Sequence, residues 1–132
     1  MNLRTVTPED AQALQRLINE AFNRIDAGDI DESHFNNPNI HSLIAEENNI
    51  LLGTASLHII TKLDRKMGQI EDVVVAPNAR GKGVGKVLVQ GLLALSTEKK
   101  CYKVILNTND QNIPFYEKLG FVKGENQMVI RN

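Results

Sequence analysis

Residues 73–95 read VVVAPNARGKGVGKVLVQGLLAL. The three valines are typical of a strand, and Pro77 ends it. A loop with three glycines and three basic residues follows at Arg80–Lys86, and apolar residues then recur at helical spacing as far as Leu95. A helix N-terminus offers unpaired N–H groups and a positive dipole end, and glycine lets a ligand approach the backbone. The stretch therefore predicts a strand–turn–helix unit with a phosphate site.

Two well-known phosphate motifs do not fit this loop. A P-loop requires Ser or Thr after Gly-Lys, but Val87 follows Gly85 and Lys86, and Arg80 stands where the first glycine belongs. The dinucleotide-binding pattern G-x-G-x-x-G also fails, because the glycines of residues 81–85 are spaced one residue too closely. A basic glycine turn with a purely structural role remains an alternative for the loop taken alone.

Length and composition indicate one ordinary globular domain, residues 1–132. The formal net charge of -1 argues against general nucleic-acid binding, which requires a basic surface. The sequence has neither an apolar run long enough to span a membrane nor the apolar core of a signal peptide at its start, so we expect a cytoplasmic protein. Cys101 is alone and is expected to be a buried structural thiol. His34, His41 and His58 lack metal-ligand spacing, so no metal is expected.

The remaining sequence predicts a mixed α/β (α+β) domain. Thr7, followed by Pro-Glu-Asp, predicts a helix start after a first short strand, and Gly120 predicts the end of a short helix from Asn112. Residues 40–60 are typical of a hairpin with its turn at 47–49. Further strands are expected at 68–75, at 101–107, and as two short strands around Gly124.

The loop pattern Arg80-x-x-Gly83-x-Gly85 and the later segment NIPFYEKLGF, Asn112–Phe121, together resemble the GNAT superfamily of acyl-CoA-dependent N-acetyltransferases. Within it, the strings IEDVVV, CYKVIL and MVIR are similar to those of glucosamine-phosphate N-acetyltransferases, over Gly68–Arg131. The resemblance implies a mixed sheet of six to seven strands flanked by about four helices. It also implies a splayed cleft between two parallel strands.

The same resemblance implies that acetyl-CoA lies in this cleft. Its pantetheine arm would pair with a strand backbone, and its pyrophosphate would accept hydrogen bonds from loop N–H groups. The implied CoA-contacting residues are Val73, Val74, Val75, Arg80, Gly81, Lys82, Gly83, Val84, Gly85, Lys86, Asn112 and Tyr116. For Asn112, a helix N-cap role is the alternative.

The chemistry requires an amine that has lost its proton, a polarised thioester carbonyl and stabilisation of the leaving thiolate. Glu71 and Asp72 are expected at the head of the cleft strand, on opposite faces, and the resemblance implies that both contact the substrate. We expect Glu71 to be a base acting through water. The alternative is that both carboxylates only bind substrate or form ion pairs. The resemblance implies that Tyr116 is the general acid toward the thiolate, and packing on a helix face is its alternative.

The acceptor is expected to be a primary amine of a small molecule, with an aminosugar phosphate as one candidate. By resemblance, Asn107 and Arg131 contact it, and Arg131 reaches the site of a partner subunit in a homodimer. Asn107 departs from the acidic residue of the eukaryotic sugar-phosphate enzymes, and a solvated terminal charge is the alternative for Arg131. Specificity is expected in residues 24–39 and 62–66. Another amine acceptor (an amino acid, a polyamine or a peptide), or a CoA-binding regulatory module without turnover, are the alternative functions.

Overall fold

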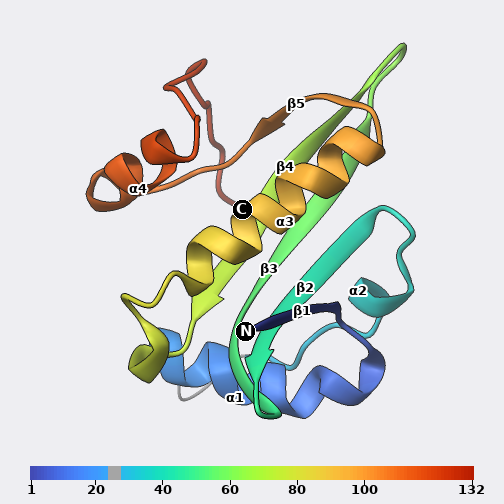
Figure 1. Ribbon diagram of the computed structural model, residues 1–132. Coiled ribbons are helices and arrows are strands. Elements are labelled where there is room, and N and C mark those ends of the chain that lie inside the picture. Colours follow the sequence, from blue (N-terminus) through green and yellow to red (C-terminus); the bar gives the residue numbers. More distant parts are fainter. Residues whose placement is uncertain (24–27) are drawn as a thin grey trace.

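The computed structural model describes residues 1–23 and 28–132, and Figure 1 shows how the elements follow one another. The strands are β1 (Asn2–Thr5), β2 (Ile40–Glu47), β3 (Ile50–Thr61), β4 (Lys66–Val75) and β5 (Cys101–Ile105). The α-helices are α1 (Ala11–Phe22), α2 (Ser33–Asn36), α3 (Val84–Glu98) and α4 (Ile113–Lys118). Three short 3₁₀ helices are η1 (Pro8–Asp10), η2 (Pro77–Ala79) and η3 (Asp110–Asn112).

The strands form one five-stranded sheet in the order β1-β2-β3-β4-β5. Neighbours are antiparallel except β4 and β5, which are parallel and are connected through α3. The mixed sheet and the four α-helices confirm the predicted class, but the predicted six to seven strands were too many among the described residues. The difference lies in the C-terminal segment, residues 121–132, which forms no helix or strand although all of it is described.

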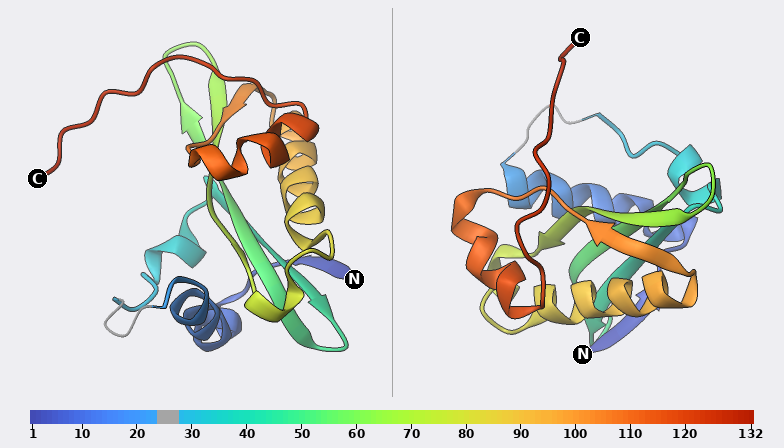
Figure 2. Two further views of the ribbon diagram at one scale, coloured as in Figure 1. Left: turned by 90° about the vertical axis from the view of Figure 1, so that its left-hand side faces the viewer. Right: turned by 90° about the horizontal axis from the view of Figure 1, so that it is seen from above.

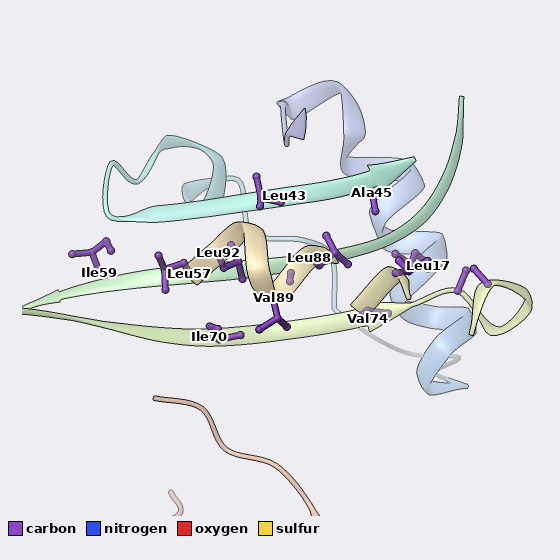
Figure 3. Close-up of a cluster of buried hydrophobic side chains, with 14 residues drawn as sticks. Leu17, Leu43, Ala45, Leu57, Ile59, Ile70, Val74, Leu88, Val89 and Leu92 are labelled. Carbon is purple, nitrogen blue, oxygen red and sulfur yellow. The ribbon is translucent and has the colours of Figure 1, made fainter. Parts of the chain in front are cut away.

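Two layers of helices enclose the sheet. Figure 2 shows α3 on one face and α1 with α2 on the other. Leu88 and Leu92 of α3 are fully buried in one cluster with Leu57 of β3, and Figure 3 shows Leu92 beside Leu57. On the opposite side Leu17 of α1 packs in the same cluster. Burying such side chains stabilises the fold by about 1.5–3 kcal/mol each, so this core fixes the position of β4.

The turns of the N-terminal half follow from local chemistry. Asn48 and Asn49 have φ values of 52° and 63°, the left-handed pair that a two-residue hairpin turn requires, which confirms the predicted turn. The N–H of Thr7 donates to the carboxylate of Asp10 (2.8 Å), which confirms the predicted helix start. Arg4 binds the same carboxylate with two hydrogen bonds of 2.8 Å, so β1 is fastened to the start of α1.

Strand β4 carries an irregularity at its centre. Glu71 is opposite Ser56, but Val74 is opposite Thr54, so β4 has one residue more than β3 in this interval. The extra residue produces a bulge, where Asp72 has a φ of 55°. Pairing with β5 ends at Gln69 and Ile105, whereas β4 continues to Val75. The bulge thus lies just beyond the point where the two parallel strands cease to pair.

The C-terminal segment contains the one clear error in the predicted elements. Two strands around Gly124 were predicted, but residues 121–132 form none, and Figure 2 shows the C-terminal end running away from the α/β body. Met128 and Ile130 are each 92% exposed. A strand requires hydrogen-bonding partners and a face to bury, and in this arrangement the described chain supplies neither for these residues.

Candidate functional site

The glycine loop lies between the end of β4 and the start of α3. Gly81 and Gly83 have φ values of 77° and 82°, a region that favours glycine, so the backbone conformation itself requires these two residues. A Cβ at either position would meet nothing within 4 Å, so the surface above the loop is open. Gly83 caps α3, and it has no side chain with which to occupy the first N–H groups. Arg80 and Lys82 are exposed here.

The third glycine lies against two other elements. Gly85 lies inside α3, and a Cβ on it would come to 3.4 Å from Cζ of Phe115 and 3.7 Å from Cγ2 of Val75, which are ordinary contact distances. The first turn of α3 therefore lies close to both α4 and the end of β4. This contact places α4 beside the loop.

Tyr116 is half-buried on α4, with edge-to-face contacts to Phe115 (4.9 Å between centroids) and Phe121 (5.7 Å). Burial raises the pKa of the Tyr116 hydroxyl above its ordinary value of 10. The phenol is therefore protonated at neutral pH and can donate a hydrogen bond. Its ring also packs against the core, so part of the packing alternative holds.

The two carboxylates of β4 lie at the bulge. Glu71 is opposite Ser56, and its Oε1 accepts a hydrogen bond from Nε2 of Gln69 (2.6 Å). Burial lowers the pKa of His34, a residue of α2, and the negative charge of Asp72 opposes this lowering. The sequence did not reveal the bulge, which interrupts the regular alternation of side chains at Asp72.

A cavity of about 1050 Å³ lies between β5, α4 and the C-terminal segment. Asn107 and Tyr116 line it, together with residues 119–127. Glu71, Asp72 and the glycine loop are not among its lining residues. The structure thus brings Asn107 and Tyr116 together and leaves the carboxylates outside this cavity.

Two further predicted residues lie at or beyond α4. Asn112 occupies the N-cap position of α4, as its alternative role predicted, but its side chain makes no capping hydrogen bond. Asn109 is the N-cap of η3, and its side chain accepts from the N–H of Asn112 (3.1 Å). Arg131 is exposed and adjoins the C-terminus, which Figure 2 shows away from the body. Residues 24–27 of the predicted specificity segment lie outside the described residues.

The rest of the described chain adds two observations. In residues 1–23 and 28–132, no group of three or more His, Cys, Asp or Glu side chains gathers as a metal site would. Within the same ranges, none of the helices combines the length and apolarity that crossing a bilayer requires. Cys101 is partly rather than fully buried, and burial raises the pKa of its thiol.

The sequence did not indicate the hydrogen bonds of His34. Its Nε2 lies 2.7 Å from Oγ of Ser42, whereas we expected all three histidines to be structural or exposed. Nothing in the pattern of polar residues marks this pair, because His34 and Ser42 meet only once α2 packs on β2.

Comparison with known proteins gives a family match over residues 9–121, to the acetyltransferase (GNAT) family. Glucosamine 6-phosphate N-acetyltransferase of Trypanosoma brucei brucei is 51% identical over 81 residues, 59% of this chain and 55% of that protein. The protein of the same name from Candida albicans is 39% identical over 92 residues, 67% of this chain and 62% of the relative. The chain thus spans between half and two thirds of the length of these relatives.

Solved structures agree with this match. The crystal structure of a Trypanosoma brucei acetyltransferase has a TM-score of 0.83 and 34% identity, over 99% of both chains. Glucosamine-6-phosphate N-acetyltransferase from Arabidopsis thaliana has a TM-score of 0.77 and 28% identity, also over 99% of both chains. The glycine loop before α3, the adjacent α4 and these likenesses lead to one conclusion: the chain belongs to the acetyltransferase (GNAT) family.

Proposed function

We propose that this chain is an acetyl-CoA-dependent N-acetyltransferase whose acceptor is the primary amine of an aminosugar phosphate. One observation carries the proposal: β4 leaves β5 after Gln69, two residues before Glu71, and continues to an open glycine loop. Along the chain, the unpaired edge of β4 with its two carboxylates is followed by the glycine loop and then by the N-terminus of α3. The names of the curated relatives support the choice of acceptor.

The binding of acetyl-CoA would use the backbone. Beyond the last β4–β5 pair, the strands form a splayed cleft in which residues 73–75 offer backbone groups to the pantetheine amides, as an added strand would. The N–H groups of residues 80–86 and the positive end of α3 suit the pyrophosphate, and Arg80 and Lys82 add positive charge. The open space above Gly81 and Gly83 fits a group of that size.

Bound acetyl-CoA supplies the thioester carbonyl carbon that the amine attacks. Glu71 takes the proton that the ammonium must lose, acting through water. A backbone N–H near Val73 donates to the thioester oxygen, where negative charge develops. The Tyr116 hydroxyl donates a hydrogen bond to the departing thiolate. Since burial raises the pKa of Tyr116, full proton transfer is harder, and stabilisation by the hydrogen bond is its main contribution.

The acceptor's phosphate calls for a cation. We assign it to Arg131 of a partner subunit in a homodimer, because a planar guanidinium binds phosphate with two parallel hydrogen bonds. The backbone of residues 128–130 would then pair as a strand with the neighbouring copy, and this pairing would cover their exposed apolar side chains. Strand β5 is an edge of the sheet, and such edges accept added strands.

A thiol-release assay with acetyl-CoA and a panel of amines tests the function. The panel holds glucosamine 6-phosphate, other aminosugars, amino acids, polyamines and peptides. We expect the fastest turnover with glucosamine 6-phosphate. If only another amine of the panel is acetylated, that amine replaces the aminosugar phosphate as the proposed acceptor. Binding without turnover on any amine would favour the CoA-binding module.

Thermal melts with EDTA present test acetyl-CoA binding separately. Ligand at about 100 times its Kd adds roughly 2.7 kcal/mol to the free energy of unfolding. Gly83→Asp places a carboxylate against the pyrophosphate and should abolish this stabilisation. Gly28→Asp is the control for added charge, because a Cβ there would also meet nothing within 4 Å and Gly28 is not among the residues that line the cavity. A wild-type chain with an unchanged melt at millimolar acetyl-CoA would refute the binding site.

Asn107 provides a test of the acceptor itself. An amide can neither take a proton nor neutralise an ammonium, and Asn107 lines the cavity beside Tyr116. If Asn107 limits the reaction with glucosamine 6-phosphate, Asn107→Asp should raise kcat/KM for that amine. An unchanged or lower value would assign position 107 to a role that does not need charge.

A further inference from the structure

A line of hydrogen-bonded side chains crosses the face of the sheet that α1 and α2 cover. Nε2 of His34 lies 2.7 Å from Oγ of Ser42, which in turn lies 2.6 Å from Oγ of Ser56. Ser42 and Ser56 are buried, at 7% and 4% exposure, whereas His34 is partly exposed. The line therefore runs from the interior of the sheet to solvent.

The inner end of this line adjoins the proposed base. Ser56 is directly opposite Ser42 on one side and Glu71 on the other, so the three side chains project from the same face. Directly opposite residues of antiparallel strands have Cβ atoms about 4.5–5.5 Å apart, a span that one water molecule can bridge between their polar groups. Gln69 holds the Glu71 carboxylate by its 2.6 Å hydrogen bond.

We propose that Ser56, Ser42 and His34 form a proton relay that carries the acceptor's amine proton from Glu71 to solvent. The inference rests on the proposed function, since only an amine acceptor releases this proton. The three residues act through Glu71 and are positioning and relay residues. None of them needs to touch the substrate.

Each transfer balances. The ammonium gives a proton to the Glu71 carboxylate, which passes it, directly or through water, to Oγ of Ser56. Ser56 gives its own hydroxyl proton to Oγ of Ser42, and Ser42 gives its own to Nε2 of His34. The resulting imidazolium loses the Nδ1 proton to solvent, which leaves the neutral ring protonated on Nε2. Before the next cycle the partly exposed ring turns to solvent and exchanges its proton there, which restores the Nδ1–H form, and the hydroxyls rotate back. This direction requires neutral His34 to carry its proton on Nδ1.

The surroundings of His34 suit a proton acceptor near neutral pH. Burial lowers the pKa of its imidazole, and nearby His58 on β3 acts in the same direction. Asp72 on β4 and Asp31 before α2 oppose them. His34 is therefore neutral at pH 7 and above, and it can accept a proton. The His58 ring lies edge-on to His34, with centroids 6.1 Å apart, and its buried Nε2 lacks a hydrogen-bond partner among the described residues.

His34→Gln is the sharpest variant, because its amide can keep the bond to Ser42 but cannot carry a proton. With glucosamine 6-phosphate as acceptor, we expect kcat at pH 7.5 to fall about tenfold, the acid limb of the pH profile to disappear, and free imidazole in solution to restore part of the rate. The acetyl-CoA-induced melting shift should stay. His41→Gln is the matched control. His41 precedes Ser42 on β2 and is opposite Leu57 of the apolar core, so it lies on the other face of the sheet from the relay.

Two further measurements keep the relay falsifiable. Ser42→Ala should reproduce the loss without rescue by imidazole, because the break lies inside the sheet. Nitrogen NMR of wild-type His34 should show the Nδ1–H tautomer, and a proton on Nε2 would overturn the direction of transfer. An active wild type with unchanged kcat and pH profile in His34→Gln would overturn the relay alone. A wild type that acetylates no amine would overturn the proposed function and the relay together.

Discussion

Each end of the chain carries a short segment that the sequence predicted to be a strand, and the two segments have different fates. NLRTV near the N-terminus has its apolar side chains separated by polar ones, whereas QMVIRN at the C-terminus has three consecutive apolar residues, 128–130. The first becomes β1 and pairs with β2 from Asn2 to Thr5. The second stays unpaired, with Val129 55% exposed and its two neighbours more so.

The difference shows that a strand-like sequence needs a partner strand but does not determine where that partner lies. β1 finds it in the same chain, where Arg4 adds hydrogen bonds to Asp10 and Glu46. For residues 127–132 the proposed partner is a second copy. Changes in β1 should therefore alter stability at any protein concentration, and changes in the C-terminal segment should alter association and acceptor binding.

Arg131→Ala gives the largest expected effect. Loss of two charge-assisted hydrogen bonds to phosphate should raise the acceptor's KM about 100-fold, equivalent to about 2.7 kcal/mol, and leave acetyl-CoA binding unchanged. Lys118→Ala is the control, because it removes an exposed charge from α4 and Lys118 is not among the residues that line the cavity. Steady-state kinetics at fixed acetyl-CoA measure both. Unchanged acceptor kinetics, or a monomer by light scattering, would refute the shared site.

Tyr116→Phe probes the place where the C-terminal segment begins, because the Tyr116 ring on α4 contacts Phe121 at the start of that segment. Only the hydroxyl is lost, and its partner charge exists only near the transition state, so kcat should fall about 10- to 100-fold, with a smaller change in KM for acetyl-CoA. Phe121→Leu is the packing control. If kcat is unchanged while chemistry limits the rate, Tyr116 belongs to packing alone.

Leu3→Ala and Ile130→Ala form a matched pair across the two ends. Leu3 packs against the core, so its truncation should lower the free energy of unfolding by about 1–2 kcal/mol, independently of protein concentration. Ile130 is 92% exposed, so its truncation should leave the monomer's stability unchanged and weaken the dimer. Urea melts at two protein concentrations separate the two effects. Equal losses in both variants would show that the C-terminal segment packs on its own chain.

Arg4→Met gives the smallest effect, and it depends on pH. The Arg4 guanidinium lowers the pKa of Asp10 to about 2, so the pair stabilises the fold fully above the ordinary value of 3.8 and loses that contribution as pH falls through about 2. After allowance for the partial exposure of Arg4, we expect a loss of about 1 kcal/mol at pH 7. Arg16→Met, on the exposed side of α1, is the control. A difference from wild type that stays constant down to pH 2 would exclude the pair as its cause.

Local chemistry decided which parts of the fold were predictable. The turn at Asn48–Asn49, the helix start at Thr7 and the glycine loop before α3 each depend on a few neighbouring residues, and all three were predicted. The absence of strands from the C-terminal segment was not predicted, because a strand forms between segments and the apolar run at residues 128–130 does not identify a partner. The family resemblance supplied the strand count that the described chain does not reach.

The candidate site likewise has parts that the sequence predicted and parts that it did not. The loop and Tyr116 were found from their motifs, but the bulge at Asp72 was not. A bulge is set by the register between β3 and β4, which no single segment encodes, and an aspartate only tolerates the positive φ. The meeting of His34 with Ser42 likewise depends on where α2 packs.

The contact between Gly85 and Phe115 has an evolutionary consequence. An alanine Cβ at position 85 would just touch the Phe115 ring, at 3.4 Å, so glycine and alanine are both admissible there. A bulkier residue would have to displace the ring, and with it the helix that carries Tyr116. Among homologues we expect correlated substitutions at positions 85 and 115, with a larger side chain at one position accompanied by a smaller side chain at the other.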